Sequence, residues 1–367
     1  MIDRDDLAAW LRLIETPGIG RDGARRLLAA FGSAQAVFDA GLTARREIVG
    51  ETQADALDAS PDGFDSLLRA TLEWLGGAED GAGRGILTLG DDAYPPLLLD
   101  TADPPLLLYT LGRVELLAAP SLAVVGSRNP TAQGRDNARA FAAHLSRAGL
   151  GIVSGLALGI DGAAHEGGLD GASSTVAVVG TGLDRVYPSR HRALAHRIAR
   201  DGLLVTEYSL GTPLLAQNFP IRNRLIAGLT RGTLVVEAAL QSGSLITARF
   251  ATEAGRDVFA IPGSIHSPQS RGCHALIKDG AKLVEHANDI LDELRLATAV
   301  PAPSSGATTT STDPLLQSLG YDPVTLDVLI ARTGRSAADL GARLLELELD
   351  GVVQRLPGQL FQRRVAA

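Results

Sequence analysis

A chain of 367 residues is long enough for two or three domains, and its 45% hydrophobic and 21% charged residues exclude wholesale disorder. No apolar run approaches the ~20 residues of a membrane-spanning helix, and the acidic start MIDRDDLAAW is unlike a secretory signal peptide. Cys273 is the single cysteine, which excludes a disulfide framework and a cysteine-based metal site. We therefore expect a cytoplasmic protein without a metal or another cofactor.

The formal net charge of −8 counts against a nucleic-acid partner, but the charges are unevenly distributed. Residues 121–231 contain twelve arginines and seven acidic residues, whereas residues 1–80 contain eight arginines and fifteen acidic residues. Surface potentials fall off within a Debye length of ~8–10 Å, so a local basic field can attract an anion to an acidic chain. The central region is therefore the candidate anion-binding part. An arginine outside its loops can equally belong to a solvated helix face.

The first predicted domain, residues 1–80, shows short helical patterns without strand-like alternation. A helix, the turn Gly18–Gly20 and a second helix resemble the helix-hairpin-helix element of many DNA-binding proteins, or a SAM-like helical domain. The glycines permit the tight turn, and the first amides of the second helix could face a phosphate. Because the surroundings are acidic, packing or partner contact is favoured over DNA binding, and both interpretations stay open.

The second predicted domain, residues 84–296, alternates apolar runs with helical patterns. The predicted strands are Ser121–Val125, Gly151–Ser154, Ser174–Val179, Leu203–Glu207, Gly232–Glu237 and Asp257–Ile261. The predicted helices are Ala138–Ala148, Arg192–Arg200, Asn223–Leu229 and Ile246–Ala254. This alternation predicts an α/β, Rossmann-like domain with a mostly parallel sheet and helices on both faces. In such folds the ligand lies at the carboxyl ends of the strands.

The rest of the chain forms a linker and a small module. Residues 297–313 are rich in Ala, Pro, Ser and Thr and nearly uncharged, which predicts a flexible linker. In residues 314–367, Val324–Leu329 and Ala337–Asp350 look helical, and a short hairpin follows from Gly351. Helices followed by a two-stranded wing predict a winged-helix-like domain. Its second helix is acidic, so we expect it to contact protein rather than a DNA groove.

The candidate binding loops each follow a predicted strand. Gly126, Ser127 and Arg128 offer close backbone approach, a hydroxyl and a planar guanidinium for phosphate. The turn at Ser154 and Gly155 opens a helix whose N-terminus would stabilise a phosphate. The third and fourth loops add arginines beside an aromatic ring, suited to phosphate neutralisation with base stacking, and a Ser-Gly-Ser turn. They contain Phe219, Arg222, Asn223 and Arg224, and Ser242, Gly243 and Ser244.

Six motifs in the chain carry a resemblance to a known family. They occur in this order between residues 126 and 284, and the resemblance covers about residues 94–284: GSRNPT, SGLALGIDGAAHEGGL, GLDRVYP, FPIRNRLIAGLT, EAALQSGSLITARFATEAGRDVFAIPG and GCHALIKDGAKLV. Together they closely resemble the DNA-processing protein A (DprA/Smf) family. The resemblance implies single-stranded DNA binding in a Rossmann-fold groove, dimerisation through that fold, and loading of the RecA recombinase onto DNA in natural transformation, with recombinational repair as a second setting. It also implies that the loop residues named above contact the DNA.

This chain departs from the family pattern in two respects. Many relatives have an arginine where this chain has Leu158, which would remove or move one phosphate contact. Lysine occurs only at Lys278 and Lys282, so arginine must supply nearly all of the positive charge that binds phosphates. We expect Arg224→Ala to weaken DNA binding for every sequence and to flatten its salt dependence.

Two alternatives remain besides a DNA-binding protein without catalytic activity. The first is a nucleotide N-glycosidase of related fold, whose resemblance would imply a Pro-Gly-Gly-x-Gly-Thr loop followed by a glutamate. Here the loop from Gln241 lacks both, with Glu237 before it and Glu253 beyond it. Asp161, close before His165, is expected to cap its helix rather than to act as a base. The second alternative is a nucleotide-sensing protein, for which a mononucleotide would compete with a long oligonucleotide.

Overall fold

The computed structural model describes residues 2–77, 81–296 and 313–364 of the chain. It divides into two compact units, residues 1–297 and 298–367. The predicted linker, residues 297–313, falls almost wholly on residues 297–312 and so lies outside the described residues.

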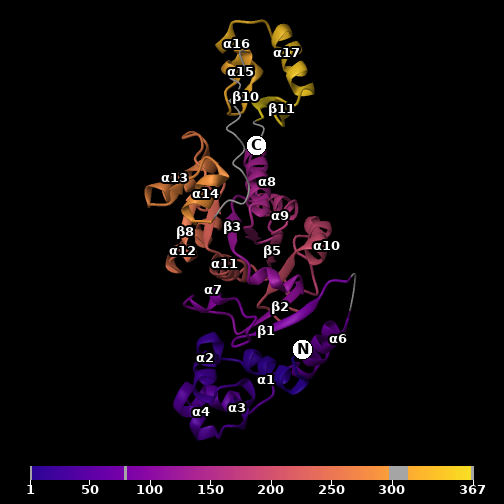
Figure 1. Ribbon diagram of the computed structural model, residues 1–367, viewed down its shortest axis with the longest axis vertical. Helices are drawn as coiled ribbons and strands as arrows, with labels where there is room; N and C mark the ends of the chain where they lie inside the picture. The colour runs from indigo at the N-terminus through magenta and orange to yellow at the C-terminus, as the bar shows by residue number, and fades with distance from the viewer. Residues whose placement is uncertain (1, 78–80, 297–312, 365–367) are drawn as a thin grey trace. The chain divides into compact units, whose positions relative to one another are not determined.

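A nine-stranded sheet in the described part of the chain is the centre of the first unit (Figure 1). Its strands are β1 (Arg84–Thr88), β2 (Leu107–Gly112), β3 (Ser121–Val125), β4 (Gly151–Ser154), β5 (Thr175–Val178), β6 (Leu203–Thr206), β7 (Gly232–Val235), β8 (Asp257–Ala260) and β9 (Lys282–Leu283). The order is β1-β2-β6-β5-β4-β3-β7-β8-β9. All pairs are parallel except β1 with β2 and β2 with β6. The predicted mostly parallel sheet is thus confirmed, and β1, β2 and β9 were missed.

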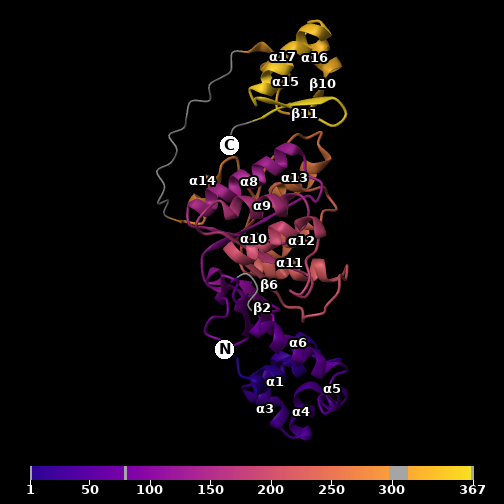
Figure 2. The same ribbon diagram turned by 90° about the vertical axis from the view of Figure 1, so that its right-hand side faces the viewer.

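Helices cover both faces of this sheet, because successive strand residues point to opposite sides. Leu122 and Val124 of β3 pack in one core with α8 (Ala132–Arg147), α9 (Ile160–Leu169) and α14 (Ala287–Glu293). Ala123 and Val125 pack in another core with α11 (Asn218–Gly228), α12 (Ser244–Glu253) and α13 (Arg271–Lys278). Figures 1 and 2 both show α8 beside α9. The remaining elements are α7 (Pro96–Leu99), α10 (Arg192–Asp201), and the 3-10 helices η1 (Val114–Leu117), η2 (Ser189–His191) and η3 (Pro268–Ser270).

The N-terminal part of the first unit is helical, as predicted. It contains α1 (Arg4–Glu15), α2 (Gly20–Phe31), α3 (Ala34–Asp39), α4 (Leu42–Val49), α5 (Glu51–Ala56) and α6 (Phe64–Gly76). Their apolar faces share a core with Leu107 and Tyr109 of β2. At the predicted hairpin, Gly18 and Gly20 have φ values of 83° and 62°, a conformation that favours glycine.

Basic side chains after this hairpin are held within the chain. Arg21 Nε lies 2.7 Å and Arg25 Nη1 2.6 Å from the two carboxylate oxygens of Asp103. Both arginines belong to the first turns of α2, where a DNA backbone would have to approach. Their engagement favours the packing interpretation of the hairpin over the DNA-binding one.

The second unit has the pattern of a winged helix. It consists of α15 (Pro314–Leu319), β10 (Val324–Thr325), α16 (Leu326–Thr333), α17 (Ala337–Leu349), β11 (Val353–Leu356) and β12 (Leu360–Arg363), with the sheet order β10-β12-β11. Ser336 caps α17 by accepting a hydrogen bond from the Asp339 amide. Among all the residues described, no helix combines the length and hydropathy needed to cross a membrane.

Candidate nucleic-acid interface

The strand order reverses beside β3, and this reversal creates a cleft. From β3 the chain continues outward through β4 and β5 on one side, while β7 and β8 lie on the other side. The loops that follow β3 and β7 therefore diverge, which is the position where open α/β sheets bind ligands. A cleft of about 440 Å³ lies there. We call it the switch-point cleft.

The cleft brings together nine of the twelve predicted site residues. They are Gly126, Ser127, Arg128, Phe219, Arg222, Asn223, Ser242, Gly243 and Ser244. They come from three separate stretches of chain, namely the loop after β3, the first half of α11 and the turn into α12. Ser154, Gly155 and Arg224 do not line it.

Glu237 holds the loop after β3 in a fixed shape. Its carboxylate accepts hydrogen bonds from the Thr131 amide (2.9 Å) and hydroxyl (2.5 Å), and its carbonyl accepts one from the Ser127 amide (2.7 Å). A Cβ on Gly126 would lie 2.7 Å from the Ile160 side chain and 2.9 Å from the Glu237 carbonyl oxygen, so glycine is required there. The result is a rigid loop that carries Arg128 exposed at the rim.

Phe219 presents a half-buried ring beside this guanidinium. The Arg128 Cζ lies 6.0 Å from the centre of the Phe219 ring, and the Tyr187 ring packs against the same ring at 5.6 Å between centroids. A cation next to an exposed aromatic face can neutralise a phosphate while the ring stacks a base.

Arg222 forms part of the floor of the cleft rather than its rim. It is only 3% exposed, and its Nη1 donates a hydrogen bond to the Val178 carbonyl (2.7 Å). Burial lowers the pKa of Arg222 to about 10, which the nearby Asp161 opposes, so the guanidinium stays charged at neutral pH. It contributes a buried positive charge to the floor of the cleft.

Arg224 lies outside the cleft, contrary to its predicted place. Its guanidinium pairs with the buried Glu207 carboxylate, and its Nε lies 3.3 Å from Asp103. Arg222 and Arg224 both belong to α11, and residues two apart on a helix are about 200° apart around its axis. One of the two can therefore face the cleft and the other cannot. This position does not support a phosphate contact for Arg224.

The polar groups of the turn at Ser154 and Gly155 also form hydrogen bonds within the protein. Ser154 is fully buried, and its hydroxyl donates to the Val124 carbonyl (2.6 Å). The Gly155 and Ala157 amides donate to the Asp161 carboxylate at 3.1 and 3.3 Å. The Ile160 amide, the first of α9, donates to the Ser127 carbonyl. The expectation of a phosphate on free amides of this helix N-terminus is therefore not supported.

The turn into α12 closes the other side of the cleft. The Ser242 and Ser244 hydroxyls lie 2.7 Å apart and bond each other, and the Asn223 side-chain amide donates to the Gly243 carbonyl (3.3 Å). This bond joins α11 to the turn. The Ser-Gly-Ser segment thus offers hydroxyl groups to a ligand from a position fixed by α11.

Sequence reasoning missed several residues of the cleft, Asp161 above all. The N-cap of α9 is Gly159, and the Asp161 carboxylate instead bonds the preceding loop, so the predicted cap is wrong in its geometry. Burial raises the pKa of Asp161, while Arg222 and the two loop amides oppose the shift. Asn129, Gln241 and Gln269 also line the cleft. In the sequence, the only indication for Asn129 and Gln241 is that each is adjacent to a predicted binding loop.

His165 is fully buried and fixes the same turn. Its Nε2 accepts a hydrogen bond from the Leu156 amide (3.2 Å), so its Nδ1 carries the proton and donates to the Thr175 hydroxyl (2.7 Å). Thr175 in turn donates to the Ile152 carbonyl (2.7 Å). This series of hydrogen bonds requires the His165 imidazole to be neutral. A neutral, fully bonded imidazole agrees with a structural role for His165 rather than a catalytic one.

The buried His165 predicts a loss of stability in acid. Burial lowers its pKa to about 3, below the ~6.5 of an exposed histidine. Between these values the unfolded state binds the proton and the native state does not. His165 should thus lower the free energy of unfolding by up to ~1.4 kcal/mol per pH unit as the pH falls from 6.5 toward 3. Urea unfolding at several pH values would measure this slope. The slope of the unfolding free energy against pH should be smaller in His165→Gln. It should be unchanged in the control His266→Gln, which removes an exposed histidine. Equal slopes in the two variants would show that His165 is not the residue responsible.

Comparison with known proteins identifies the family. A family model described as DNA recombination-mediator protein A matches residues 85–295, which is more than half of the chain. This chain belongs to that family. A DprA-like N-terminal HHH domain model matches residues 4–61, and a DprA winged helix domain model matches residues 299–359. The predicted family resemblance, the helical N-terminal domain and the winged helix are therefore confirmed.

Three relatives in this DNA recombination-mediator family match between 57% and 98% of this chain. Protein Smf of Escherichia coli (strain K12) is 37% identical over 98% of this chain and 97% of its own length. The X-ray structure of DNA processing protein A (DprA) from Streptococcus pneumoniae has a TM-score of 0.68 at 37% identity, covering 80% of this chain and 98% of that one. DNA processing protein A from Helicobacter pylori, whose structure is described as showing a unique single-stranded DNA binding mode, has a TM-score of 0.53 at 30% identity. It covers 57% of this chain and 95% of that one.

Proposed function

We propose that this chain binds and protects single-stranded DNA in the switch-point cleft. One observation carries the proposal. The exposed Arg128 guanidinium and the Phe219 ring lie next to each other in a cleft whose floor contains the buried Arg222. Arg128 neutralises a phosphate, and Phe219 stacks an unpaired base, which gives a preference for single strands over duplex. The single-stranded DNA binding of the Helicobacter pylori relative supports the same ligand.

The other predicted site residues have distinct parts in this proposal, inside the cleft or behind it. Gly126 lets the strand approach the backbone, and Ser127, Ser242 and Ser244 offer hydroxyls to phosphate oxygens. Asn223 and Gly243 hold the far wall. Ser154 and Gly155 shape the floor beneath Arg222, and Arg224 acts on stability.

Replacement of Arg128 by alanine tests the site. We expect weaker binding of oligo-dT and a log–log salt slope that is flatter by ~0.7 for each lost phosphate contact. Fluorescence anisotropy at several salt concentrations measures both quantities. Arg147→Ala, which removes an exposed arginine of α8 outside the cleft, is the matched control. Unchanged affinity and slope in Arg128→Ala would refute the site.

We further propose that the chain is not an enzyme. The nearest candidate for a glycosidase glutamate, Glu237, has both carboxylate oxygens engaged by Thr131. Asp161, the acidic residue of the cleft lining, is bound by two loop amides. Incubation with nucleoside monophosphates should release no free base, and the appearance of free base would revive the glycosidase alternative. Competition by a mononucleotide at micromolar concentration would instead favour a nucleotide sensor.

The membership of the family supports a role in recombination. We propose that the chain loads the RecA recombinase onto the bound strand in natural transformation, with recombinational repair as a second setting, and that it acts in the cytoplasm. The measurement is the lag before RecA filaments grow on single-stranded DNA that is covered by a single-strand binding protein. The chain should shorten that lag, and Arg128→Ala should lengthen it again.

A homodimer through the Rossmann-like domain completes the proposal. The edge strand β9 consists of Lys282 and Leu283, both exposed, and it leaves one side of the sheet open. The support for a dimer is therefore the family resemblance, because a two-residue edge strand that contains a lysine is itself a poor template for pairing with another chain. Sedimentation velocity would detect the dimer, and a monomer at all concentrations would refute it.

A further inference from the structure

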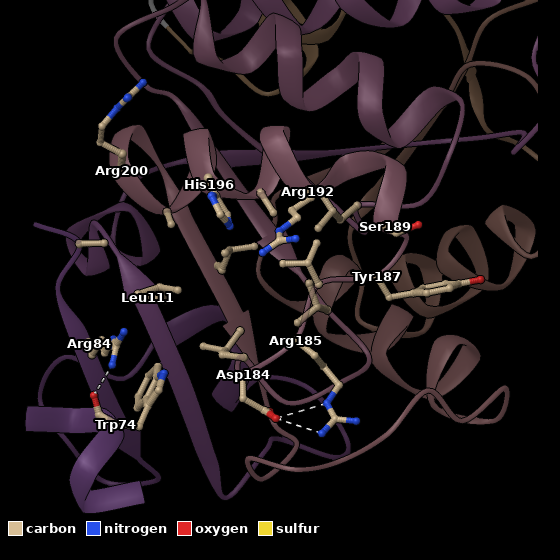
Figure 3. Close-up of a pocket in the computed structure, with 18 residues that line it drawn as sticks. Trp74, Arg84, Leu111, Asp184, Arg185, Tyr187, Ser189, Arg192, His196 and Arg200 are labelled. Atoms are coloured by element: carbon tan, nitrogen blue, oxygen red, sulfur yellow. Dashed lines mark hydrogen bonds and ion pairs between the residues drawn. The ribbon is translucent and has the colours of Figure 1, made fainter. Parts of the chain in front are cut away.

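A second, larger cleft lies beside α10 and has no part in the function proposed above. It encloses about 620 Å³ between α10 and the antiparallel pair of β1 and β2, and we call it the α10 cleft. In Figure 3, Arg192 and His196 come down from α10 on one side, and Trp74 and Arg84 lie on the other. Its floor is apolar and includes Leu111, Val179 and Leu204.

The rim of the α10 cleft is basic. In the described part of the chain its lining contains four arginines, at positions 84, 185, 192 and 200, and one acidic residue, Asp184. Arg185 pairs with Asp184 at 3.0 Å, and Arg200 pairs with Asp201. Arg192 is exposed and makes no ion pair with any residue that the structure describes. An apolar floor beneath the exposed Arg192 guanidinium suits a ligand that carries both flat apolar groups and phosphates.

The two clefts share one wall. Leu156 lines the α10 cleft, and the next residue, Ala157, lines the switch-point cleft. Leu156 has a φ of 59°, which is rare for a residue with a side chain. Its amide is bound by His165 (3.2 Å), and its carbonyl accepts a hydrogen bond from His191 Nδ1 (2.9 Å). The wall is therefore held rigidly from both sides.

An aromatic ridge crosses this wall. Tyr187 lines the α10 cleft and is 46% exposed, and its ring packs on Phe219, which lines the switch-point cleft. Figure 3 shows the Tyr187 ring at the rim, pointing away from Trp74. Two adjoining rings give consecutive stacking platforms between the two basic clefts.

We propose that single-stranded DNA bound in the switch-point cleft continues across the Tyr187–Phe219 ridge into the α10 cleft. There bases lie against the apolar floor and Tyr187, and Arg192 neutralises a phosphate. The inference rests on the proposed function, because it extends the same strand. A continuous strand, rather than a separate nucleotide, is favoured by the shared wall and by the aromatic ridge between the clefts.

Binding of oligo-dT of two lengths by Arg192→Ala tests the continuation. An oligonucleotide of about four residues fills the switch-point cleft, and one of about fifteen reaches the α10 cleft as well. Arg192→Ala should bind the short one as the wild type does. It should bind the long one about fivefold or more weakly, with a salt slope flatter by ~0.7. Arg197→Ala is the matched control, since Arg197 is an exposed arginine of the same helix that lines neither cleft.

The outcomes separate the two proposals. If Arg192→Ala and the wild type bind the long oligonucleotide equally while Arg128→Ala weakens both lengths, the continuation is overturned and the proposed function stands. If the wild type binds neither length, both fail. Tyr187→Phe keeps the ring and should behave as the wild type with the long oligonucleotide, whereas Tyr187→Ala should lose affinity.

Tryptophan fluorescence gives an independent readout. The chain has two tryptophans; Trp74 lines the α10 cleft, and Trp10 is buried in the N-terminal helical core. The long oligonucleotide should quench the emission, the short one should not, and Trp74→Phe should abolish the response. Quenching by free thymidine monophosphate at the same concentration would show a separate nucleotide site and overturn the continuation.

Discussion

Replacement of Arg224 by alanine should lower the free energy of unfolding by about 3–5 kcal/mol, because the change leaves a buried carboxylate without its main partner. The Glu207 side chain is 6% exposed, and after the change the nearest cation would be Arg21, at 3.7 Å. Burial raises the pKa of Glu207, and Arg224 is the largest influence that opposes this shift. Urea unfolding at pH 7 measures the loss.

Two further measurements make the Arg224 result decisive. Arg231→Ala, which removes an exposed arginine immediately before β7, should change the free energy of unfolding by no more than about 0.5 kcal/mol. Folded Arg224→Ala protein should keep the salt slope of oligo-dT binding. A stable Arg224→Ala variant with weak binding and a flattened slope would instead return Arg224 to the DNA interface.

A methyl group on Gly155 should be nearly as disruptive, since Gly155 packs against the Arg222 guanidinium. A Cβ there would lie 1.8 Å from Arg222 Nη1 and 2.4 Å from its Cζ. The guanidinium would have to leave its bond with the Val178 carbonyl, so Gly155→Ala should cost about 2–4 kcal/mol of stability. It should also weaken oligo-dT binding, because Arg222 is displaced beneath the cleft.

A double-mutant cycle isolates this contact. Arg222→Ala alone should cost about 3–5 kcal/mol, because it leaves Asp161 buried without the nearby positive charge. In that background Gly155→Ala has room for its methyl group and should cost little more. The coupling between the two sites should therefore be about 1–3 kcal/mol. Additive effects would show that Gly155 does not act through Arg222.

The sheet and its binding edge were predictable from the sequence. Strands buried on both faces read as continuous apolar runs, and all six predicted strands are present within two residues of their predicted ends. Because parallel strands end at the same edge, the loops at Gly126 and Ser242 had to lie close together. β2 was missed because Pro104 and Pro105 directly precede its apolar run, which makes the stretch look like a loop, and β1 was missed because its apolar run is only Ile86 and Leu87.

The positions of the two α11 arginines depend on where that helix begins. The sequence indicated a start at Asn223, after Pro220, whereas α11 starts at Asn218 and accommodates the proline in its first turn. Because α11 contains both Arg222 and Arg224, the helical periodicity places the two side chains on opposite sides of the helix. The partners of Arg224 are Glu207, at the end of a predicted strand, and Asp103, more than a hundred residues away, and no local pattern in the sequence joins either of them to Arg224.

The hydrogen bonding of the turn before α9 could not be predicted from the sequence for a similar reason. Glycines after a strand suggest free amides, but Asp161 and His165 return from the next helix and take up three of them. Their spacing alone allows a helix cap, a base or this internal network. Only the burial of both side chains, at 7% and 0% exposure, distinguishes these.

The scarcity of lysine has a practical consequence for the bench. Lys278 ends α13 and Lys282 begins β9, so the side-chain amines of the whole chain lie in one short segment beside the open sheet edge. Amine-reactive dyes, biotin esters or sensor chips would attach there or at the N-terminal amine. Neither cleft contains a lysine, so both would stay accessible on an immobilised molecule. The same coupling would modify the edge strand β9 without entering either cleft, so a labelled sample should keep whatever affinity for oligo-dT the unlabelled protein has.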